Sequence, residues 1–254
     1  MSSEEHDLRV LPDAVSAAHA AAEILASLLN EALDGAGGAS EGGRAGRASL
    51  AVSGGSSPRP MFARLAELGG RSLGTGSPGG VDWDSVEVFQ VDERVAPAED
   101  ADRNLVDLRR ELTDRCVPSE QVHAMPVELG AEAAAEVYAG TLVEVLGSEP
   151  SLDVVHLGIG DDGHTASLVP GDAVLEVRDR DVAATGVYQG RRRVTLTFPM
   201  LDRAGAVVWL VTGASKAPAL AQLVGGDPGI PASHVRCRPS IVVADAEAAR
   251  LLPH

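Results

Sequence analysis

Short apolar runs alternate with helical patterns along this sequence, and this alternation is what most limits the folds that the chain can adopt. One such run, residues 154–159, is short enough to be a buried strand of a parallel sheet. Strands that alternate with helices predict right-handed crossovers and a doubly wound α/β fold, with a mostly parallel sheet flanked by helices on both faces. We expect strands over residues 48–52, 86–91, 154–159, 181–187, 193–198, 206–212 and 240–243. We expect helices over residues 14–33, 104–115, 131–146, 216–223 and 246–252, and a further helix that starts at Pro58 or Pro60 and runs to about Leu68.

The chain shows few signs of internal division. Its 254 residues can bury a large core, as one α/β domain or as two small ones. We find no internal repeat and no linker long enough to force a boundary, so residues 1–254 are predicted to form a single domain. Residues 35–47 and 72–80 are of low complexity, which is typical of surface loops. Asp13 precedes the first helical pattern and is expected to cap it.

The formal charge of −16 limits the possible partners. Nucleic-acid binders and proteins of anionic membranes need a basic field, so neither partner is expected. A small anionic substrate remains possible, provided that basic side chains gather locally. The position of each arginine and lysine is therefore informative.

The cysteines and the apolar runs bear on compartment and cofactors. Cys116 and Cys237 are the two cysteines and form no CxxC motif, which fits a reducing compartment and offers no zinc site. The histidines lack metal-ligand spacing, so no metal is expected. No apolar run approaches the ~20 residues of a membrane span, and residues 1–7 carry no signal-peptide pattern. These features predict a cytoplasmic protein.

Four of the predicted strands end in conspicuous polar sequences. In a parallel sheet the carboxyl ends of the strands lie along one edge, where ligands of such folds bind. We therefore expect one pocket built from four segments that are distant in the sequence. These are residues 53–57, 92–94, 160–164 and 213–216.

His164 is the best candidate for acid–base chemistry. It follows Asp161 and Asp162 in a segment that also holds glycines at 158, 160 and 163. An imidazole with a pKa near ~6.5 is suited to taking and returning a proton at neutral pH. The alternative is a residue at the start of a short helix, ended by Pro170, that only hydrogen-bonds the backbone. His156, inside the strand, is expected to be a core residue with its hydrogen bonds satisfied.

The first and last polar segments, together with Arg94, favour phosphate binding. Ser53-Gly54-Gly55-Ser56-Ser57 lies between a strand and a helix, where free N–H groups and the helix dipole attract anions. A tight turn would explain the same glycines. Lys216 at a helix start and Arg94 after a strand would supply positive charge. Their alternatives are an exposed lysine and a salt bridge from Arg94 to Asp92 or Glu93.

Three other functions are disfavoured by the motifs. The glycine loop lacks the lysine of a Walker A motif, so ATP is not implied. Residues 158–163 match GxGxxG, but Pro170 shortens the expected helix and no second strand ends in an acidic residue at the required distance, which argues against NAD. The serines at 53, 56 and 57 lack the GxSxG elbow, so a Ser-His-Asp triad is not expected.

The same segments carry a family resemblance, over residues 48–236. The chain resembles the 6-phosphogluconolactonases, whose superfamily includes glucosamine-6-phosphate deaminases and isomerases and implies a doubly wound, Rossmann-like α/β fold. The chain departs from the family pattern at two places. Val169 stands where the family commonly has Phe, and the strand at Ser240 lacks a Trp. Both departures concern the shape of the pocket. The matching motifs are Ser53-Gly-Gly-Ser56, Asp92-Glu-Arg94, Asn104-Leu105, Gly158-Ile-Gly-Asp-Asp-Gly-His-Thr-Ala-Ser-Leu168, Arg193-Val-Thr-Leu196 and Thr212-Gly-Ala-Ser-Lys216.

The resemblance implies hydrolysis of 6-phospho-D-glucono-1,5-lactone to 6-phospho-D-gluconate, the second step of the oxidative pentose phosphate pathway. His164 would activate water and Asp162 would orient the imidazole or the water. N–H groups near Gly160 would face the oxyanion. No metal or cofactor is required, and the expected protein is a monomer or a small homo-oligomer with the phosphorylated lactone as its ligand. The phosphate would be held by Gly54, Gly55, Ser56, Arg94 and Lys216.

Two alternative functions stay open. An amino-sugar-phosphate deaminase or isomerase resembles Asp-Glu-Tyr and Phe-Asn-Glu-Pro at places where this chain has Asp92-Glu-Arg94 and Ser167-Leu-Val-Pro170. A non-catalytic sugar-phosphate sensor would carry a helix-turn-helix, for which the short N-terminal segment and the acidic charge leave no room. Ligand binding without product formation would identify the sensor.

Overall fold

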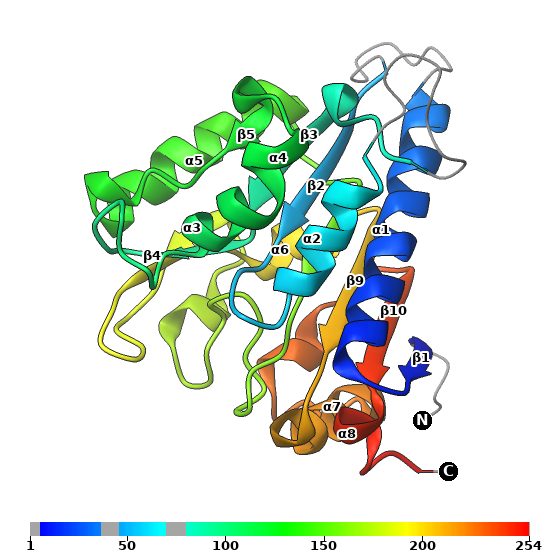
Figure 1. The fold of residues 1–254 in the computed structure, drawn as a ribbon. Helices are drawn as coiled ribbons and strands as arrows, with labels where there is room; N and C mark the ends of the chain where they lie inside the picture. Colours follow the sequence, from blue (N-terminus) through cyan, green and yellow to red (C-terminus); the bar gives the residue numbers. More distant parts are fainter. Residues whose placement is uncertain (1–5, 37–45, 70–79, 254) are drawn as a thin grey trace.

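The computed structural model describes residues 6–36, 46–69 and 80–253, and within this part of the chain a parallel sheet forms the centre of the molecule (Figure 1). Its strand order is β1-β10-β9-β6-β2-β3-β5, and all of its strand pairs are parallel. Neighbours that are not consecutive in the chain require crossovers, which confirms the doubly wound α/β class. The strands are β1 (Asp7–Leu11), β2 (Ala48–Val52), β3 (Val86–Gln90), β5 (Val122–His123), β6 (Val154–Leu157), β9 (Ala206–Val211) and β10 (Ser240–Asp245).

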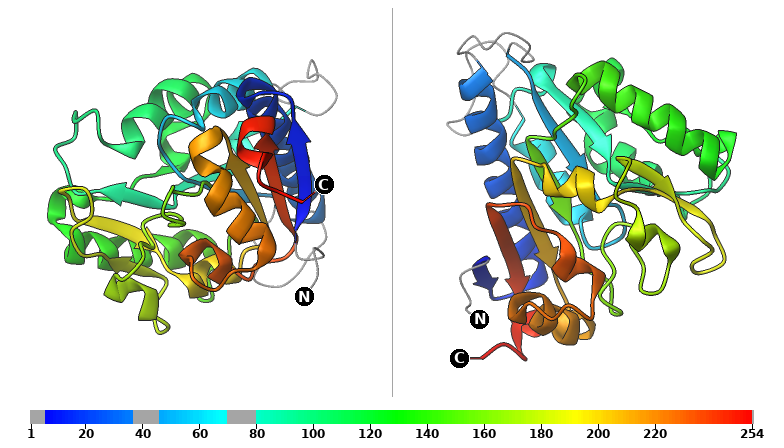
Figure 2. Two further views of the ribbon diagram at one scale, coloured as in Figure 1. Left: turned by 90° about the horizontal axis from the view of Figure 1, so that it is seen from below. Right: turned by 180° about the vertical axis from the view of Figure 1, so that it is seen from behind.

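Helices cover both faces of this sheet, as the front and back views show (Figures 1 and 2). On one face α1 (Ala14–Ala36), α2 (Arg59–Glu67) and α3 (Asn104–Leu108) share an apolar core with the strands. On the other face a second core is formed with α5 (Ala131–Leu146), α6 (Phe198–Asp202) and α7 (Ala217–Gly225). The short helices α4 (Asp114–Cys116) and α8 (Ala246–Ala249) complete the α-helices of the described chain, and a π-helical turn, Arg109–Thr113, joins α3 to α4.

Helix α1 shows why the sequence folds as predicted in this region. The Asp13 carboxylate accepts the backbone N–H of Ser16 at 2.8 Å and so caps the helix. Alanines at 17, 18, 21 and 22 are buried, and so are Leu25 and Leu29. Small side chains at helical spacing let the helix axis approach the sheet closely, so α1 itself contributes only aliphatic side chains to this core.

A second, smaller sheet departs from the expectation. Strands β7 (Val182–Ala184) and β8 (Arg193–Leu196) pair antiparallel, and β8 also pairs antiparallel with β4 (Asp92–Arg94). The two strands expected near 181–187 and 193–198 exist, but they are shorter and lie outside the parallel sheet. Their connection is too short for a crossover helix, so they form a hairpin.

Other predictions need smaller corrections. No helix follows His164, because residues 161–172 form turns with a bridge between Thr165 and Leu168. The last helix ends at Ala249 rather than near 252. Strands β1 and β5 were not predicted; β1 is an edge strand with a mostly exposed pattern and β5 has two residues. The predicted loops at 35–47 and 72–80 lie almost wholly outside the described residues.

Candidate active site

The four polar segments meet in one cavity at the carboxyl ends of the parallel strands, as the sequence predicts. The cavity has a volume of about 230 Å³, and each segment contributes to its wall. Gly54, Gly55 and Ser56 follow β2, and Arg94 ends β4 directly after β3. Gly160 and His164 follow β6, and Lys216 follows β9.

His164 lines this cavity and forms a polar pair with Asp162, which does not itself line the cavity. The Nδ1 atom of His164 lies 2.6 Å from Oδ1 of Asp162, and the same oxygen accepts the His164 backbone N–H at 3.1 Å. Burial works to raise the pKa of Asp162, but the hydrogen bonds from His164 and Tyr188 outweigh it and lower that pKa. An ionised Asp162 holds the proton on Nδ1, so Nε2 is left as the basic nitrogen.

Gly160 permits this pair by having no side chain. A β-carbon at this position would lie 2.1 Å from Nδ1 of His164 and 2.7 Å from Oδ1 of Asp162. The Gly160 N–H donates to the His164 carbonyl oxygen at 2.8 Å, and the Gly163 N–H donates to the Gly160 carbonyl oxygen at 3.0 Å. These two N–H groups are therefore occupied. In the described chain the N–H groups of Asp161 and Asp162 have no such acceptor.

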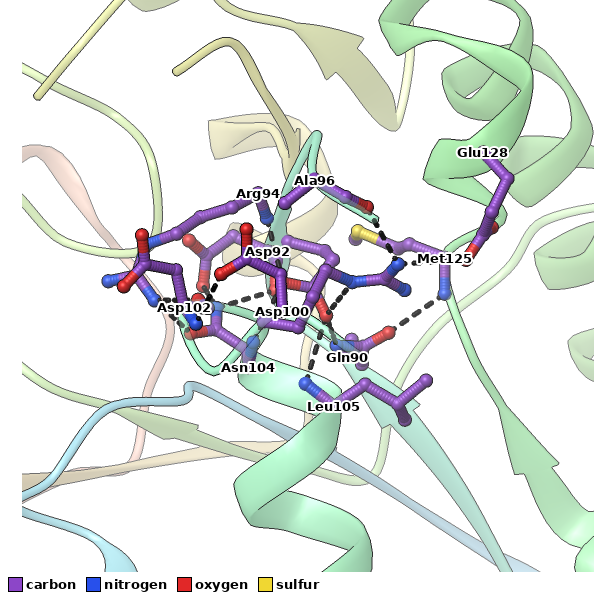
Figure 3. Close-up of polar contacts among 12 residues, drawn as sticks. Gln90, Asp92, Arg94, Ala96, Asp100, Asp102, Asn104, Leu105, Met125 and Glu128 are labelled. Atoms are coloured by element: carbon purple, nitrogen blue, oxygen red, sulfur yellow. Dashed lines mark hydrogen bonds and ion pairs between the residues drawn. The ribbon is translucent and has the colours of Figure 1, made fainter. Parts of the chain in front are cut away.

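Arg94 is held in the cavity wall by an amide rather than by a carboxylate. Its Nη1 donates to Oδ1 of Asn104 at 3.0 Å and to the backbone oxygen of Asp102 (Figure 3). Asn104 in turn donates from Nδ2 to the Asp92 carbonyl oxygen at 3.0 Å. The alternative of a salt bridge from Arg94 to Asp92 or Glu93 is wrong, so the guanidinium charge is not cancelled by a paired carboxylate.

A fully buried carboxylate, Glu93, supports this arrangement from behind. It accepts the backbone N–H groups of Arg94 at 2.7 Å, Asn104 at 2.8 Å and Leu105 at 2.9 Å. The last two belong to the first turn of α3, where negative charge is stabilising. Arg103 balances the charge, with its Nε 3.1 Å from Oε2 of Glu93. The second residue of the Asp-Glu-Arg motif thus fixes the backbone on which Arg94 is carried.

Lys216 has a partner in the neighbouring segment. Its Nζ lies 2.5 Å from Oδ1 of Asp161, which also accepts the Ser215 hydroxyl at 3.2 Å. The hydrogen bond from Lys216 is the largest cause that lowers the pKa of Asp161. The alternative of a lysine that merely reaches solvent is therefore wrong. An anion that binds Lys216 has to share it with Asp161 or displace that carboxylate.

Arg193 is a third cation of the cavity that the sequence reasoning did not assign to the site. Arg193 is only 4% exposed, and its Nε has no hydrogen-bond partner in the described chain. Its Nη1 donates to Oγ of Ser167 at 3.4 Å, and Ser167 donates to Oδ2 of Asp92 at 2.6 Å. Burial raises the pKa of Asp92 and lowers that of Arg193. Its motif, Arg193-Val-Thr-Leu196, was the available signal.

His156 also lines the cavity, and its environment corrects the sequence prediction. It is buried in β6 as expected, with its ring edge-on to Phe62 at 6.2 Å between centroids. Neither ring nitrogen has a hydrogen-bond partner among the described residues, so the residue is not satisfied. Burial lowers its pKa to about 3, which keeps the imidazole neutral.

The described chain offers few alternatives for other chemistry. In it, no three side chains of the His, Cys, Asp and Glu types are grouped so as to hold a metal ion. None of its helices has the length and apolarity needed to cross a membrane. The concentration of Arg94, Arg193 and Lys216 in one cavity of an acidic protein instead suits a small anion.

The chain is similar to known proteins over most of its length. The sequence model of the family described as "Glucosamine-6-phosphate isomerases/6-phosphogluconolactonase" matches residues 12–243. A curated protein from Nostoc sp., named 6-phosphogluconolactonase, is 34% identical over 222 residues, which cover 85% of this chain and 84% of the relative.

Solved structures show the same fold. A structure described as 6-phosphogluconolactonase from Trypanosoma cruzi has a TM-score of 0.82 and 24% identity, and the match covers 100% of this chain and 99% of the other. A monomeric glucosamine-6-phosphate deaminase has a TM-score of 0.77 and 18% identity, with 96% and 99% covered. The fold alone therefore does not separate the two activities.

Proposed function

This chain belongs to the family of glucosamine-6-phosphate isomerases and 6-phosphogluconolactonases, and we propose that it hydrolyses 6-phospho-D-glucono-1,5-lactone with His164 as general base. The product is 6-phospho-D-gluconate, so the reaction is the lactonase step of the pentose phosphate pathway. The observation that carries the residue assignment is the 2.6 Å contact of Asp162 with His164, which lines a cavity together with the side chains of Arg94, Arg193 and Lys216.

His164 acts on the attacking water. With Nδ1 held by Asp162, Nε2 removes a proton from water as the water oxygen attacks C1 of the lactone. The carbonyl oxygen becomes an oxyanion, to which we assign the N–H groups of Asp161 and Asp162 as donors because they have no acceptor within the described chain. When the intermediate collapses, the bond between C1 and the ring oxygen breaks and His164 returns its proton to that oxygen. The new carboxylic acid then ionises.

The phosphate of the substrate binds at the other side of the cavity. The N–H groups of Gly54, Gly55 and Ser56 have no hydrogen-bond acceptor within the described chain and lie just before α2, where anions are favoured. Arg94 is held from behind by Asn104 and keeps its charge uncompensated, and Lys216 adds a second positive charge. Fixing the phosphate there orients the ring so that C1 reaches His164.

The test is hydrolysis of freshly generated 6-phosphogluconolactone, coupled to 6-phosphogluconate dehydrogenase and followed by NADPH formation against the spontaneous rate. His164→Ala should lower kcat by about 100-fold or more with little change in thermal stability. His19→Ala is the matched control, because His19 is exposed on α1 away from the cavity. Unaltered kcat in His164→Ala would remove the general base from the proposal.

The same preparation separates the alternative functions. Ammonia released from glucosamine 6-phosphate would identify a deaminase. Binding of 6-phosphogluconate by a folded protein that does not accelerate lactone hydrolysis would identify a sensor. Either result, together with no lactonase activity, would overturn the proposed function.

Three broader properties complete the proposal. The two apolar cores share the central sheet, which supports residues 1–254 acting as one α/β domain. Size-exclusion chromatography with light scattering tests the expected monomer or small homo-oligomer. The cytoplasmic location and the independence from a metal or cofactor stay predictions, the latter tested by activity after exhaustive dialysis against EDTA.

A further inference from the structure

Asp162 is bound by a second residue besides His164. The hydroxyl of Tyr188 donates to Oδ2 of Asp162 at 3.0 Å, while Oδ1 faces the imidazole at 2.6 Å. The two carboxylate oxygens thus have different donors from different segments. A carboxylate held at both oxygens has one preferred rotation about its side-chain bond, and so it presents a fixed acceptor to His164.

The ring of Tyr188 contacts two further site residues. It meets the His164 ring edge-on, with 5.4 Å between centroids and an angle of 67°. On its face lies the guanidinium carbon of Arg193, 5.0 Å from the ring centroid. Edge-on aromatic contacts and cation–π contacts both restrict the orientation of the ring. Tyr188 therefore packs between the general base and the buried cation of the cavity.

The backbone keeps Tyr188 in this place. It stands before the tight turn of the β7–β8 hairpin, where its N–H donates to the Arg191 carbonyl oxygen at 2.9 Å and the reverse bond measures 3.2 Å. The two turn residues, Gln189 and Gly190, have φ of 51° and 78°, as the common two-residue hairpin turn requires. Gln189 also accepts from Nη2 of Arg193 at 3.2 Å.

We infer that Tyr188 is a positioning residue for the reaction, which fixes the Asp162 carboxylate and the His164 ring through its hydroxyl and its ring. The inference rests on the proposed function of His164. Tyr188 acts through Asp162 and His164 and not on the substrate itself. It belongs to the small antiparallel sheet, so the hairpin between β7 and β8 becomes part of the catalytic apparatus.

The hydroxyl also affects how strongly the site holds a proton. Its hydrogen bond withdraws negative charge from Asp162, which weakens the stabilisation of protonated His164. The other charged groups nearby are Asp161 with its partner Lys216, and Arg193 on the far face of the Tyr188 ring. None of these is removed when the hydroxyl is. A Tyr188→Phe variant therefore leaves Asp162 with fuller charge, and His164 is protonated at higher pH.

The experiment measures kcat, KM and the pH profile of the Tyr188→Phe variant. We expect kcat to fall about threefold to tenfold, the loss corresponding to one hydrogen bond, with KM changed by less than about twofold. We expect the acidic limb of the kcat/KM profile to move up by a few tenths of a pH unit, roughly. A fall in kcat without a shift of the acidic limb would show that Tyr188 has only a structural role, and it would overturn the inference.

A second readout does not depend on turnover. The imidazole signals of the free protein are followed by NMR against pH, and the signal of His164 is identified by its loss in His164→Ala. Its titration midpoint should be higher in Tyr188→Phe. An unchanged midpoint would overturn the inference even in an active enzyme, whereas a raised midpoint in a protein without lactonase activity would leave Tyr188 in place and reject the proposed function.

Tyr138→Phe is the matched control, because the chain has two tyrosines and Tyr138 lies in the core. Its hydroxyl bonds the backbone of Gln90 at 2.8 and 2.9 Å. Losing it should lower thermal stability and leave both the acidic limb and the His164 midpoint unchanged. A displacement as large as that of Tyr188→Phe would mean that general loosening of the fold, rather than the Tyr188 hydroxyl, sets the profile.

Discussion

The side chain of Asn104 occupies the space that a β-carbon on Gly54 would need. Such a carbon would lie 2.3 Å from Cγ and 2.4 Å from Oδ1 of Asn104. The same Oδ1 accepts from Arg94 at 3.0 Å. The glycine loop after β2 and the guanidinium of Arg94 are therefore linked through one amide, although they are far apart in the chain.

Gly54→Ala should weaken substrate binding because the new methyl group displaces Asn104 and frees Arg94. We expect KM for the phosphorylated lactone to rise about tenfold or more, the cost of a charged hydrogen bond. The control is Gly140→Ala in α5, where a β-carbon would meet nothing within 4 Å. That change should raise stability by about 0.5–1 kcal/mol and leave KM alone. An unchanged KM in Gly54→Ala would contradict the link.

Arg94→Gln and Lys216→Gln should each discriminate between substrates. Each removes one positive charge from the phosphate side of the cavity, so kcat/KM for the phosphorylated lactone should fall by about 10- to 100-fold. Hydrolysis of unphosphorylated gluconolactone should change far less. Arg180→Gln is a control, because Arg180 lies outside the cavity and pairs with exposed Asp179. Equal losses for both lactones would remove these side chains from phosphate binding.

Asp161→Asn should release Lys216 for the ligand. The pKa of Asp161 is lowered, so at neutral pH its carboxylate is charged and competes with phosphate for the ammonium group. The inhibition constant of inorganic phosphate should fall by about twofold to fivefold at low ionic strength, and the effect should shrink in 1 M salt. A rise in that constant would show instead that Asp161 holds Lys216 in a binding position.

His156→Leu should flatten the dependence of stability on pH. The pKa of His156 is about 3 in the folded protein and near ~6.5 when unfolded, so the unfolded chain binds the extra proton between these values. The free energy of unfolding is therefore unaffected by His156 at a pH above ~6.5, the pKa in the unfolded chain. It falls by up to ~1.4 kcal/mol per pH unit as the pH drops below that pKa.

The free energy of unfolding of His156→Leu is measured with denaturant between pH 7 and pH 4. Its slope against pH should correspond to the uptake of about one proton less on unfolding than in the wild type. The leucine should also raise stability at pH 7, because it removes two buried nitrogens without partners. His19→Leu, at an exposed position, should leave the slope unchanged. The same slope in wild type and His156→Leu would mean that water or a conformational change reaches this imidazole.

The sequence predicted the main sheet because its strands are buried on both faces and are therefore continuous apolar runs. The burial of β2, β3, β6, β9 and β10 confirms this reason. Strand β1 was not predicted, because it is an edge strand whose side chains are mostly exposed and it therefore lacks a continuous apolar run. The second sheet was not predicted as a separate sheet either, because local periodicity does not indicate which sheet a strand joins.

The site was predictable where its residues follow parallel strands and less so elsewhere. His164, Arg94 and Lys216 were found from that rule, and they do line one cavity. Arg193 lies inside a strand of the antiparallel sheet, and Tyr188 lies in its hairpin, so the rule does not reach them. The contacts of Asp161 and Asn104 depend on long-range packing that spacing along the chain does not encode.

The residues that line the cavity are spread widely along the sequence, which has a consequence for biosynthesis. The earliest of these residues is Ser53 and the latest is Lys216, and β9, which precedes Lys216, lies between β6 and β10. A growing polypeptide on the ribosome therefore lacks the last cationic side chain of the cavity until β9 and Lys216 have been synthesised. Catalytic competence should then appear in a single late step, and nascent fragments that end before β9 should be inert however well their first strands have folded.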